Sequence, residues 1–302
     1  MVRDTRQLDT APSPFPTLKP VAVSPLRLAW RAFRHNRPAL LGSLVLLGLL
    51  FSAVFAPVLA PYDYRAFNAG KPLKPPNIEH WMGTDRQTRD VFSRVLYASR
   101  ISLAVGFAAV ALIMLIGISL GALAGYFGGV LDNLIMRVTD IMLSIPLLFL
   151  LIAAAALFTP GLRTTILVIG FTSWMTTARL VRAEFLRLRN LDYVTAARAL
   201  GASNARIIIR HLLPNALPAI IVQATLWLSY AILLESSLSF LGLGVQPPTP
   251  TWGTMLADGR VDMRLGWWVA VFPGLAIFLT VLAFNLVGEG LRDALDPWRY
   301  RR

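Results

Sequence analysis

The chain has 302 residues, of which 56% are hydrophobic and 15% are charged, and its formal net charge is +13. An average soluble domain is only about 45–50% apolar, so this excess indicates a membrane protein. The positive charge alone would suit nucleic-acid binding, but long uncharged runs separate the basic residues, which argues against that class. Without cysteine, and with three histidines far apart, the chain is expected to hold no disulfide and no metal site.

The first 37 residues are polar and basic, and residues 26–37 alternate apolar side chains with four arginines. This pattern is typical of a helix that lies in the membrane interface and contacts lipid. Positive charge that only flanks a span is an equally good interpretation and gives the same topology. The following apolar run, residues 38–60, begins too late and is too long for a cleaved export signal, so it is predicted to remain as the first transmembrane helix.

Uncharged runs of membrane-spanning length follow one another along the rest of the chain. Crossing about 30 Å of hydrocarbon takes roughly 20 helical residues. The short fourth run crosses only if Arg163 and Arg179 extend toward the polar surfaces. The predicted spans are Ala39–Ala60, Ile101–Leu131, Ile141–Leu162, Thr164–Ala178, Leu212–Leu234 and Leu265–Gly288.

The six predicted spans also define the regions of the chain. Both termini are placed in the cytoplasm because the N-terminal segment and the loop at 179–210 are the most basic regions. The loop at 61–100 conflicts with this placement, since it holds seven Lys and Arg residues against four Asp and Glu residues. The predicted regions are a cytoplasmic segment at 1–37, a span at 38–60, an external loop at 61–100, a five-helix core at 101–291 that includes a cytoplasmic loop at 184–214, and a cytoplasmic tail at 292–302.

Glycines recur every fourth residue in the second predicted span, at Gly117, Gly121 and Gly125. This spacing places them on one helix face and predicts close contact with another helix. The same stretch reads GISLG, which matches the G-x-S-x-G nucleophile elbow at Ser119. That motif needs a strand-to-helix turn and a histidine base, whereas this run predicts a continuous helix, so Ser119 is interpreted as a small packing residue and no catalytic residue is expected.

Transport powered by ATP and transport powered by ions require different residues in the sequence. ATP hydrolysis by this chain would need a G-x-x-x-x-G-K-[ST] loop, which is absent, so any ATP must be hydrolysed by another chain. An ion-coupled carrier would place acids or bases within its spans. Glu235, followed by Ser236 and Ser239, is the candidate for such a group, and a substrate contact and a hydrogen-bonded structural role both remain open.

The loop between the fourth and fifth spans has its own helix signals. Asp192 is predicted as the N-cap and Gly201 as the residue after the C-cap of a short helix, Tyr193–Leu200. Its alanines would let the helix enter a groove of a partner protein, while Arg198 could pair with an acidic rim. Contact with anionic lipid is an equal alternative.

This loop resembles the EAA motif of permeases from binding-protein-dependent ABC importers. Thr195 stands where that motif usually has an acid, and His211 where it usually has isoleucine. The residues in register with the motif are Ala196, Ala197, Gly201, Leu213 and Pro214. Further patches resemble the C-type permease of dipeptide and oligopeptide importers, with Thr88 and Ala98 at positions where glycine is common; these patches are Leu26–Tyr64, Trp81–Leu103, Leu238–Gly253 and Phe284–Trp298.

The resemblance implies an all-α polytopic protein of a bacterial inner membrane, with six transmembrane helices and the type I ABC importer permease (MetI-like) fold. It implies import of dipeptides or oligopeptides, or of metal chelates, together with a second homologous permease, two cytoplasmic ATP-binding subunits that use ATP and Mg²⁺, and an external solute-binding protein. That protein is expected to meet the loops at 61–100 and 242–266, for which solvated spacers are an equal alternative. No cofactor is expected on this chain, and a stand-alone ion-coupled carrier is the alternative. The residues implied to transmit the motion of the ATPase are Asp192, Tyr193, Thr195, Ala196, Ala197, Arg198, Gly201, Ala202, Leu213 and Pro214.

Overall fold

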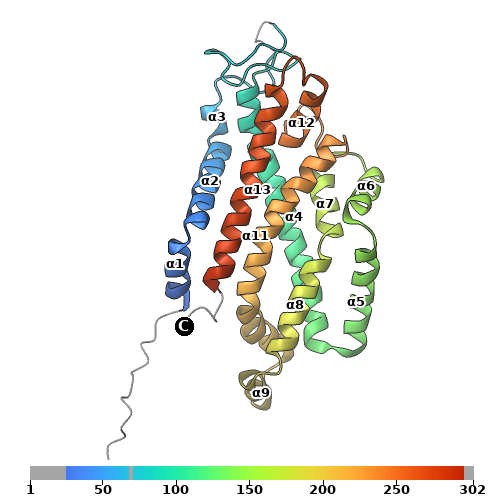
Figure 1. Ribbon diagram of the computed structural model, residues 1–302. Helices are drawn as coiled ribbons and strands as arrows, with labels where there is room; N and C mark the ends of the chain where they lie inside the picture. Colours follow the sequence, from blue (N-terminus) through green and yellow to red (C-terminus); the bar gives the residue numbers. More distant parts are fainter. Residues whose placement is uncertain (1–24, 68–70, 296–302) are drawn as a thin grey trace, which may run out of the picture.

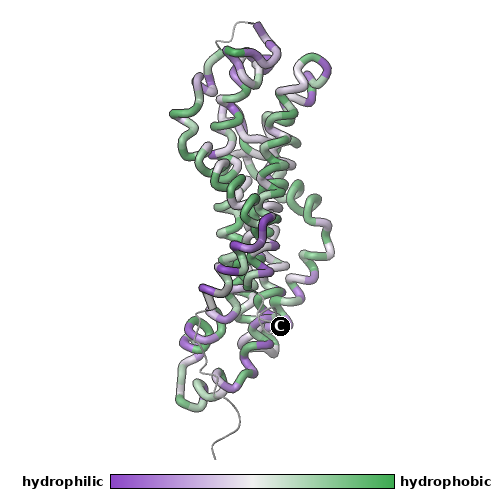
Figure 2. Tube along the Cα trace, turned by 60° about the vertical axis from the view of Figure 1, so that its left-hand side comes forward, coloured by the Kyte–Doolittle hydropathy of each residue, from purple (hydrophilic) through white to green (hydrophobic). Residues whose placement is uncertain are grey.

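The structure is a computed structural model that describes residues 25–67 and 71–295, and its regular elements in these ranges are helices (Figure 1). A single isolated β-bridge joins Thr84 to Asp90. The bundle is elongated; long hydrophobic stretches run through its upper half, and hydrophilic residues lie at its top, in a segment near mid-height and along its lower part (Figure 2). The predicted all-α class is confirmed, while residues 1–24 and most of the predicted tail at 292–302 lie outside the described ranges.

The N-terminal part forms α1 (Pro25–His35), α2 (Arg37–Val54) and the short α3 (Ala56–Leu59). Asn36 separates the first two helices and caps α2, because its side-chain oxygen accepts a hydrogen bond from the Ala39 N–H at 3.1 Å. The span predicted at 38–60 is interrupted at Phe55, since Pro57 has no N–H to continue the helix. The helix predicted at 26–37 is present, and its contact with lipid stays a prediction.

Helix α4 (Val91–Phe127) is the long central helix of the bundle and begins well before the predicted Ile101 (Figure 1). Asp90 is its N-cap, and the carboxylate accepts hydrogen bonds from the Ser93 N–H and hydroxyl, both at 2.7 Å. The helix ends at Gly128, where φ is +68° and glycine carries no steric cost. The charged residues Arg94 and Arg100 concealed this start; Arg94 is buried among protein groups, whereas Arg100 is exposed.

The span predicted at Ile141–Leu162 is not one continuous helix, because this region is two helices, α5 (Gly129–Ser144) and α6 (Leu147–Ala156), bent by 90°. Pro146 causes the break: it donates no backbone hydrogen bond and restricts the residue before it. Ile145 accordingly adopts an extended conformation, with φ of −93° and ψ of 128°.

The span predicted at Thr164–Ala178 is also interrupted, at Ser173 and Trp174, and gives α7 (Leu162–Thr172) and α8 (Met175–Leu188). Helix α8 continues far into sequence that was predicted to be a polar loop. Within this extension, Arg179 and Arg182 pair with carboxylates of α5.

The C-terminal half completes the bundle. A short helix, α9 (Asp192–Ala199), is followed by α10 (Asn204–Arg206), a π-helical turn (Ile207–Leu212) and α11 (Leu213–Phe240). The loop predicted at 242–266 contains α12 (Trp252–Val261), and α13 (Trp268–Leu295) ends the described chain. Thr251 and Thr254 start α12 with a reciprocal capping box. The predicted spans Leu212–Leu234 and Leu265–Gly288 fall almost wholly within α11 and α13.

Among the described residues, four helical segments are long and apolar enough to cross a membrane, namely α2, α4, the continuous segment Asn204–Phe240 and α13. Counting α5 with α6 as one bent span gives five, and α7 is apolar but shorter. The predicted number of six spans is therefore not confirmed. Two of the six predicted runs are broken helices, and composition alone did not show where the backbone bends.

The glycines of α4 lie against α8, as their spacing predicted. A Cβ atom on Gly121 would lie 2.5 Å from the Ala178 carbonyl oxygen, and one on Gly125 would lie 2.6 Å from the Phe185 Cβ. Ser119 does not share this contact, because its side chain is exposed and donates a hydrogen bond to the Leu115 carbonyl at 2.7 Å. The interpretation of Ser119 as a packing residue is thus wrong, whereas the glycine face is confirmed.

The contact of α4 with α8 should depend on the missing Cβ of Gly121. Gly121→Ala is expected to lower the stability of the chain by about 1–3 kcal/mol, because the backbones must move apart to admit the methyl group. Gly48→Ala is the matched control, since a Cβ there meets no atom within 4 Å. Thermal unfolding of the purified chain in detergent measures both, and equal melting temperatures for the two variants would contradict the assignment.

Candidate functional site

The loop at 184–214 places α9 at one end of the bundle, opposite the end that carries α3 and α12 (Figure 1). Helix α9 begins one residue earlier than predicted. Leu191 is the N-cap, with φ of −79° and ψ of 149°, and its carbonyl accepts hydrogen bonds from the N–H groups of Val194 and Thr195. The prediction that Asp192 is the N-cap is therefore wrong. Asp192 lies in the first turn, where its negative charge still complements the helix dipole.

The C-terminus of α9 has the geometry that Gly201 predicted. Gly201 has φ of +77°, a conformation that glycine adopts without strain. Its N–H donates to the Arg198 carbonyl, and the Ala202 N–H donates to the Ala197 carbonyl, both at 3.0 Å. This pair of hydrogen bonds is the Schellman motif, which turns the chain sharply and gives α9 a fixed end.

Most of the surface of α9 is free of contact with the rest of the chain. Val194 is fully buried and anchors the helix, whereas Leu200 is 88% exposed. The other predicted contact residues, Tyr193, Thr195, Ala196 and Arg198, are exposed, and Ala197 is partly exposed. A helix held by one buried side chain, with small residues on its outer surface, is suited to entering a groove of another protein.

The π-helical turn follows α9 and α10 in the chain and leads into α11. Its wider spacing is seen where the Leu213 N–H donates to the Ile208 carbonyl, five residues back. Such a turn gives room for Pro214, whose ring would clash with the carbonyl one regular turn before it. His211 faces Tyr193, with ring centroids 6.4 Å apart, so the residue that departs from the EAA motif touches the same helix. Leu213 is partly buried in the core and Pro214 is exposed.

Two contacts that the sequence did not predict tie this loop to α4. The Tyr126 hydroxyl donates to the Asn204 side-chain oxygen at 2.7 Å. The Arg189 guanidinium donates to the Gly125 carbonyl at 2.9 Å and so caps the C-terminal end of α4. The sequence alone could not identify Arg189 as the residue that caps α4, because Arg189 is far from α4 in the sequence.

Glu235 is fully buried near the other end of α11 and is held by serines from two helices. Its carboxylate accepts hydrogen bonds from the Ser102 hydroxyl at 3.2 Å and from the Ser239 hydroxyl at 2.7 Å. The Ser102 oxygen in turn accepts a hydrogen bond from the Trp252 N–H at 3.2 Å. This chain of hydrogen bonds joins α4, α11 and the start of α12, which favours the structural role of Glu235 over a substrate contact.

The neighbours of Glu235 bring α12 and its preceding loop close to α11. A Cβ on Gly253 would lie 2.6 Å from the Ser236 Cα, and one on Gly244 would lie 2.6 Å from the Ser239 Cα. Trp252 is fully buried, and its indole N–H donates to the Val95 carbonyl at 3.3 Å. Ser236 and Ser239, predicted beside Glu235, therefore serve as close packing positions.

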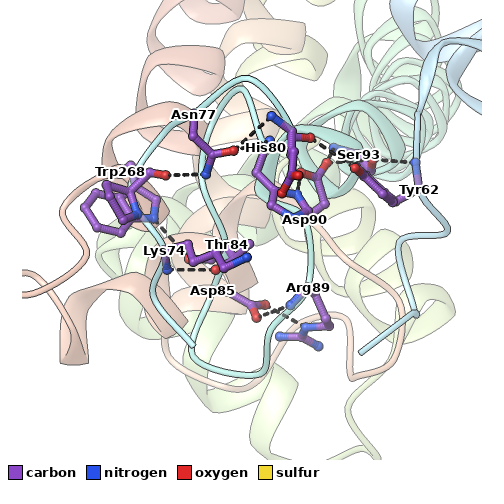
Figure 3. Close-up of polar contacts among 12 residues, drawn as sticks. Tyr62, Lys74, Asn77, His80, Thr84, Asp85, Arg89, Asp90, Ser93 and Trp268 are labelled. Carbon is purple, nitrogen blue, oxygen red and sulfur yellow. Dashed lines mark hydrogen bonds and ion pairs between the residues drawn. The ribbon is translucent and has the colours of Figure 1, made fainter. Parts of the chain in front are cut away.

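At the same end of the bundle, residues 71–90 and α12 form a structured cap (Figure 3). His80 Nδ1 lies 2.9 Å from the carboxylate of Asp90, which caps α4. The Asn77 side-chain oxygen accepts a hydrogen bond from the His80 backbone N–H at 2.9 Å. The Trp268 indole N–H donates to the Thr84 carbonyl at 3.0 Å, which joins the cap to the start of α13. The predicted loop at 61–100 is therefore not a solvated spacer over these residues.

Three cap residues, Leu73, Gly83 and Thr88, have backbone conformations that favour glycine. Gly83 has φ of +73°, and a Cβ there would lie 2.6 Å from the Lys74 carbonyl oxygen. Thr88, which stands where the resembling permeases commonly have glycine, has φ of +62°. A β-branched residue in this region is strained, so the structure gives the physical reason for glycine in the motif.

Three of the basic residues in this loop, Arg86, Arg89 and Arg94, are paired with acids of the cap. The Arg89 Nε lies 2.6 Å from the Asp85 carboxylate, and Arg89 and Arg94 both reach Asp258, at 3.7 and 3.8 Å. Arg86 lies 3.7 Å from Asp262. Desolvation raises the pKa of the Asp258 carboxyl, and Arg94 and Arg89 act against that rise. The positive charge of these three arginines is thus offset by carboxylates of the cap itself.

Charged pairs between α5 and α8 were missed altogether. Asp132 pairs with Arg182, and Asp140 pairs with Arg179. Sequence reasoning placed these acids at the ends of spans and considered Glu235 alone. The signal that could have found them is the spacing, because two acids eight positions apart and two arginines three positions apart each lie on one side of a helix.

The chain matches known families over most of its length. Residues 117–301 match the binding-protein-dependent transport system inner membrane component family. Residues 24–76 match the N-terminal transmembrane domain of oligopeptide transport permease C.

Similar proteins span nearly the whole chain. A dipeptide transport system permease protein of Alkalihalophilus pseudofirmus is 44% identical, covering 94% of each chain. A di/tripeptide transport system permease protein of Pseudomonas aeruginosa is 46% identical, covering 96% of this chain and 97% of that one. A glutathione transport system permease protein of Escherichia coli is 45% identical, covering 93% and 94%.

Solved structures share the fold at lower identity. Two inward-facing structures of the MetNI methionine ABC transporter match with TM-scores of 0.51 and 0.53 at 19% and 21% identity. They cover 66% and 65% of this chain and 96% and 93% of theirs. This likeness concerns the fold alone, and it agrees with the fold expected from the resemblance.

Removing the Ser102 hydroxyl should loosen the link between α4, α11 and α12. Ser102→Ala leaves both the Glu235 carboxylate and the Trp252 N–H without that partner, so stability is expected to fall by about 1–3 kcal/mol. Ser119→Ala in the same helix is the control, because its hydroxyl bonds only to its own helix. Thermal unfolding in detergent measures the difference, and a Ser102→Ala variant as stable as Ser119→Ala would count against a structural role for this cluster.

Relieving the strained backbone of Thr88 should stabilise the cap. The strain of about 1–3 kcal/mol exceeds the roughly 0.5–1 kcal/mol of entropy that glycine costs, so Thr88→Gly is expected to gain about 1 kcal/mol. Thr88→Ala keeps a Cβ at the same φ and is expected to show no such gain. Melting temperatures of the two variants provide the measurement, and equal values would show that the Thr88 conformation is not strained.

Proposed function

The chain belongs to the family of binding-protein-dependent transport system inner membrane components, and we propose that it forms one half of the membrane pathway of a peptide importer. It is a membrane-spanning permease subunit. In this proposal a second, homologous permease supplies the other half, and two separate cytoplasmic subunits hydrolyse ATP with Mg²⁺. This chain itself binds no cofactor and transmits motion.

The proposal of a peptide substrate rests on the similar proteins. Their names give dipeptides, di- and tripeptides, oligopeptides and glutathione as the transported compounds. All of these are short peptides, and identity to this chain extends over most of its length. Dipeptides or oligopeptides are therefore the substrate class that we assign.

The observation that carries the mechanism is the position and exposure of α9. This helix stands at the end of the bundle, is anchored by the fully buried Val194, and is closed by the Schellman motif at Gly201. Its partly exposed Ala197 would contact a groove of the ATPase subunit, and the exposed Arg198 would pair with acids at the rim of that groove. Movement of the ATPase would then displace α9 and the helices connected to it.

The end with α9 is assigned to the cytoplasm. Basic residues gather at this end, in the loop at 184–214 and in α1, where they outnumber the acids. This agrees with the rule that positively charged loops stay on the cytoplasmic side. Helix α1 and the C-terminal end of α13 lie on this side of the bundle (Figure 1). Both termini are therefore proposed to be cytoplasmic, and the cap is proposed to face the external solute-binding protein.

Contact of α9 with an ATPase can be tested by crosslinking, since the chain has no cysteine of its own. Ala197→Cys is expected to crosslink to a cysteine introduced in the groove of the ATPase subunit within the assembled transporter. Gln87→Cys, exposed in the cap at the opposite end, is the control and is expected to give no such crosslink. No crosslink from position 197 in any nucleotide state would refute the coupling role of α9.

Dependence on separate ATPases distinguishes this proposal from a stand-alone ion-coupled carrier. In liposomes, the purified chain alone is expected to take up no peptide, and the complete assembly is expected to do so only with ATP. Labelled dipeptide and a short oligopeptide are the probes. Uptake by the chain alone that disappears when ion gradients are dissipated would establish the carrier instead.

A further inference from the structure

Along much of its length, helix α5 contacts α8 through charge. Its buried residues are Asp132, Ile135 and Thr139. Much of its apolar surface is exposed in the described chain, at Val130, Leu131, Leu134, Val138 and Ile141. Apolar packing against α8 is found at the C-terminal end of α5, where Met142 and Leu143 lie against the cluster of Trp174, Met175 and Ala178. Before that end, the two carboxylates make its polar contacts with α8.

The contact of Asp132 with Arg182 has a geometry that determines both distance and orientation. The guanidinium Nε and Nη2 donate to the two carboxylate oxygens of Asp132, at 2.5 and 2.7 Å. Such a fork with two parallel hydrogen bonds is stronger and more directional than a single ionic contact. Asp140, two turns further along α5, pairs with Arg179. Two pairs on one side of α5 prevent it from sliding or rotating relative to α8.

Helix α8 is itself a rigid connection toward α9. It packs on α4 at Gly117, Gly121 and Gly125, where the two backbones are nearly in contact. Residues 189–191 alone separate the end of α8 from the start of α9. A displacement of α9 is therefore delivered to α8 over a very short connection.

The other end of α5 is the bend of 90° before α6. Discontinuous helices in transporters often lie where the substrate path is formed, because their free backbone groups must face protein or a polar cavity. A shift of α5 changes the position of this bend at Ile145 and Pro146. The two ion pairs thus lie between the proposed site of ATPase contact and a break in a membrane helix.

We propose that the pairs Asp132–Arg182 and Asp140–Arg179 are the connection through which movement of α8 displaces the broken helix pair α5 and α6 during transport. These four residues are positioning residues, and they contact neither ATP nor peptide. This inference rests on the proposed function, because it requires α9 to be moved by an ATPase. In this proposal, α5 follows the movement of α8 because the two ion pairs hold the helices together.

The inference is tested by reversing and exchanging the charges in the complete reconstituted transporter. The measured quantity is labelled peptide taken up per ATP hydrolysed. Asp132→Arg and Arg182→Asp, each alone, are expected to lower this ratio about tenfold, within the range of coupling energies between sites. The double variant that carries both changes restores an opposite-charge pair and is expected to recover most of the native ratio. Singles with native ratios, or an exchange no better than the singles, would overturn the inference.

Controls separate this outcome from other failures. Arg137→Asp reverses an exposed charge on the same helix and is expected to leave the ratio unchanged, so an equal loss there would also overturn the inference. Crosslinking from Ala197→Cys in each variant shows whether the ATPase still docks, and its absence in the otherwise native protein would refute the proposed function instead. Should the charge reversals fail to assemble, Asp132→Asn and Arg182→Gln are measured by the same ratio, and native ratios for both would overturn the inference.

Discussion

A charged or polar group inside a membrane protein must find its partner within the protein, because hydrocarbon offers none. This constraint explains the main polar features of the structure. Glu235 is enclosed by hydroxyl groups of Ser102 and Ser239. Asp132 is matched by the guanidinium of Arg182. Ser102 and Arg182 each lie on a different helix from the carboxylate they contact, so satisfying these carboxylates also determines how the helices are placed.

The same constraint divides the bundle into parts with different rigidity. At the cap end, hydrogen bonds and ion pairs join residues 71–90, α12 and the starts of α4 and α13 into one body (Figure 3). In the middle, the glycines of α4 bring α8 into backbone contact. Helix α5 and helix α9 are held by less, the first by its two ion pairs and by apolar packing at its C-terminal end, and the second by Val194. Elements with few apolar contacts are those that can move at low energetic cost.

This distribution suits a permease that is driven from one end. A partner that grips α9 acts on the least restrained helix, and the short connection to α8 passes the displacement to a helix that is firmly seated on α4. The cap, in contrast, is built to keep its shape. Under the proposed function, the chain would therefore combine a fixed end for docking with a movable end for coupling, within a family of inner membrane components of binding-protein-dependent transport systems.

Sequence alone determined the class of the protein, because composition and the lengths of apolar runs follow directly from the thickness and chemistry of the membrane. It also determined the glycine face of α4 and the turn at Gly201, since both depend on local geometry that only glycine permits. The helical segments with strong apolar runs, at α2, α11 and α13, lie close to where they were expected.

Only the tertiary structure decided which charges meet. The pairing of Arg179 and Arg182 with the acids of α5 joins residues distant in the sequence, and hydropathy treats a paired arginine and an unpaired one alike. The bend between α5 and α6 has a local cause in Pro146, but the hydropathy of the surrounding residues did not reveal it. The basic loop at 61–100 conflicted with the topology because the acids Asp258 and Asp262, which pair with its arginines, come from another segment. Local pattern gives the helices and many of their ends, and pairing across the fold gives the residues that connect them.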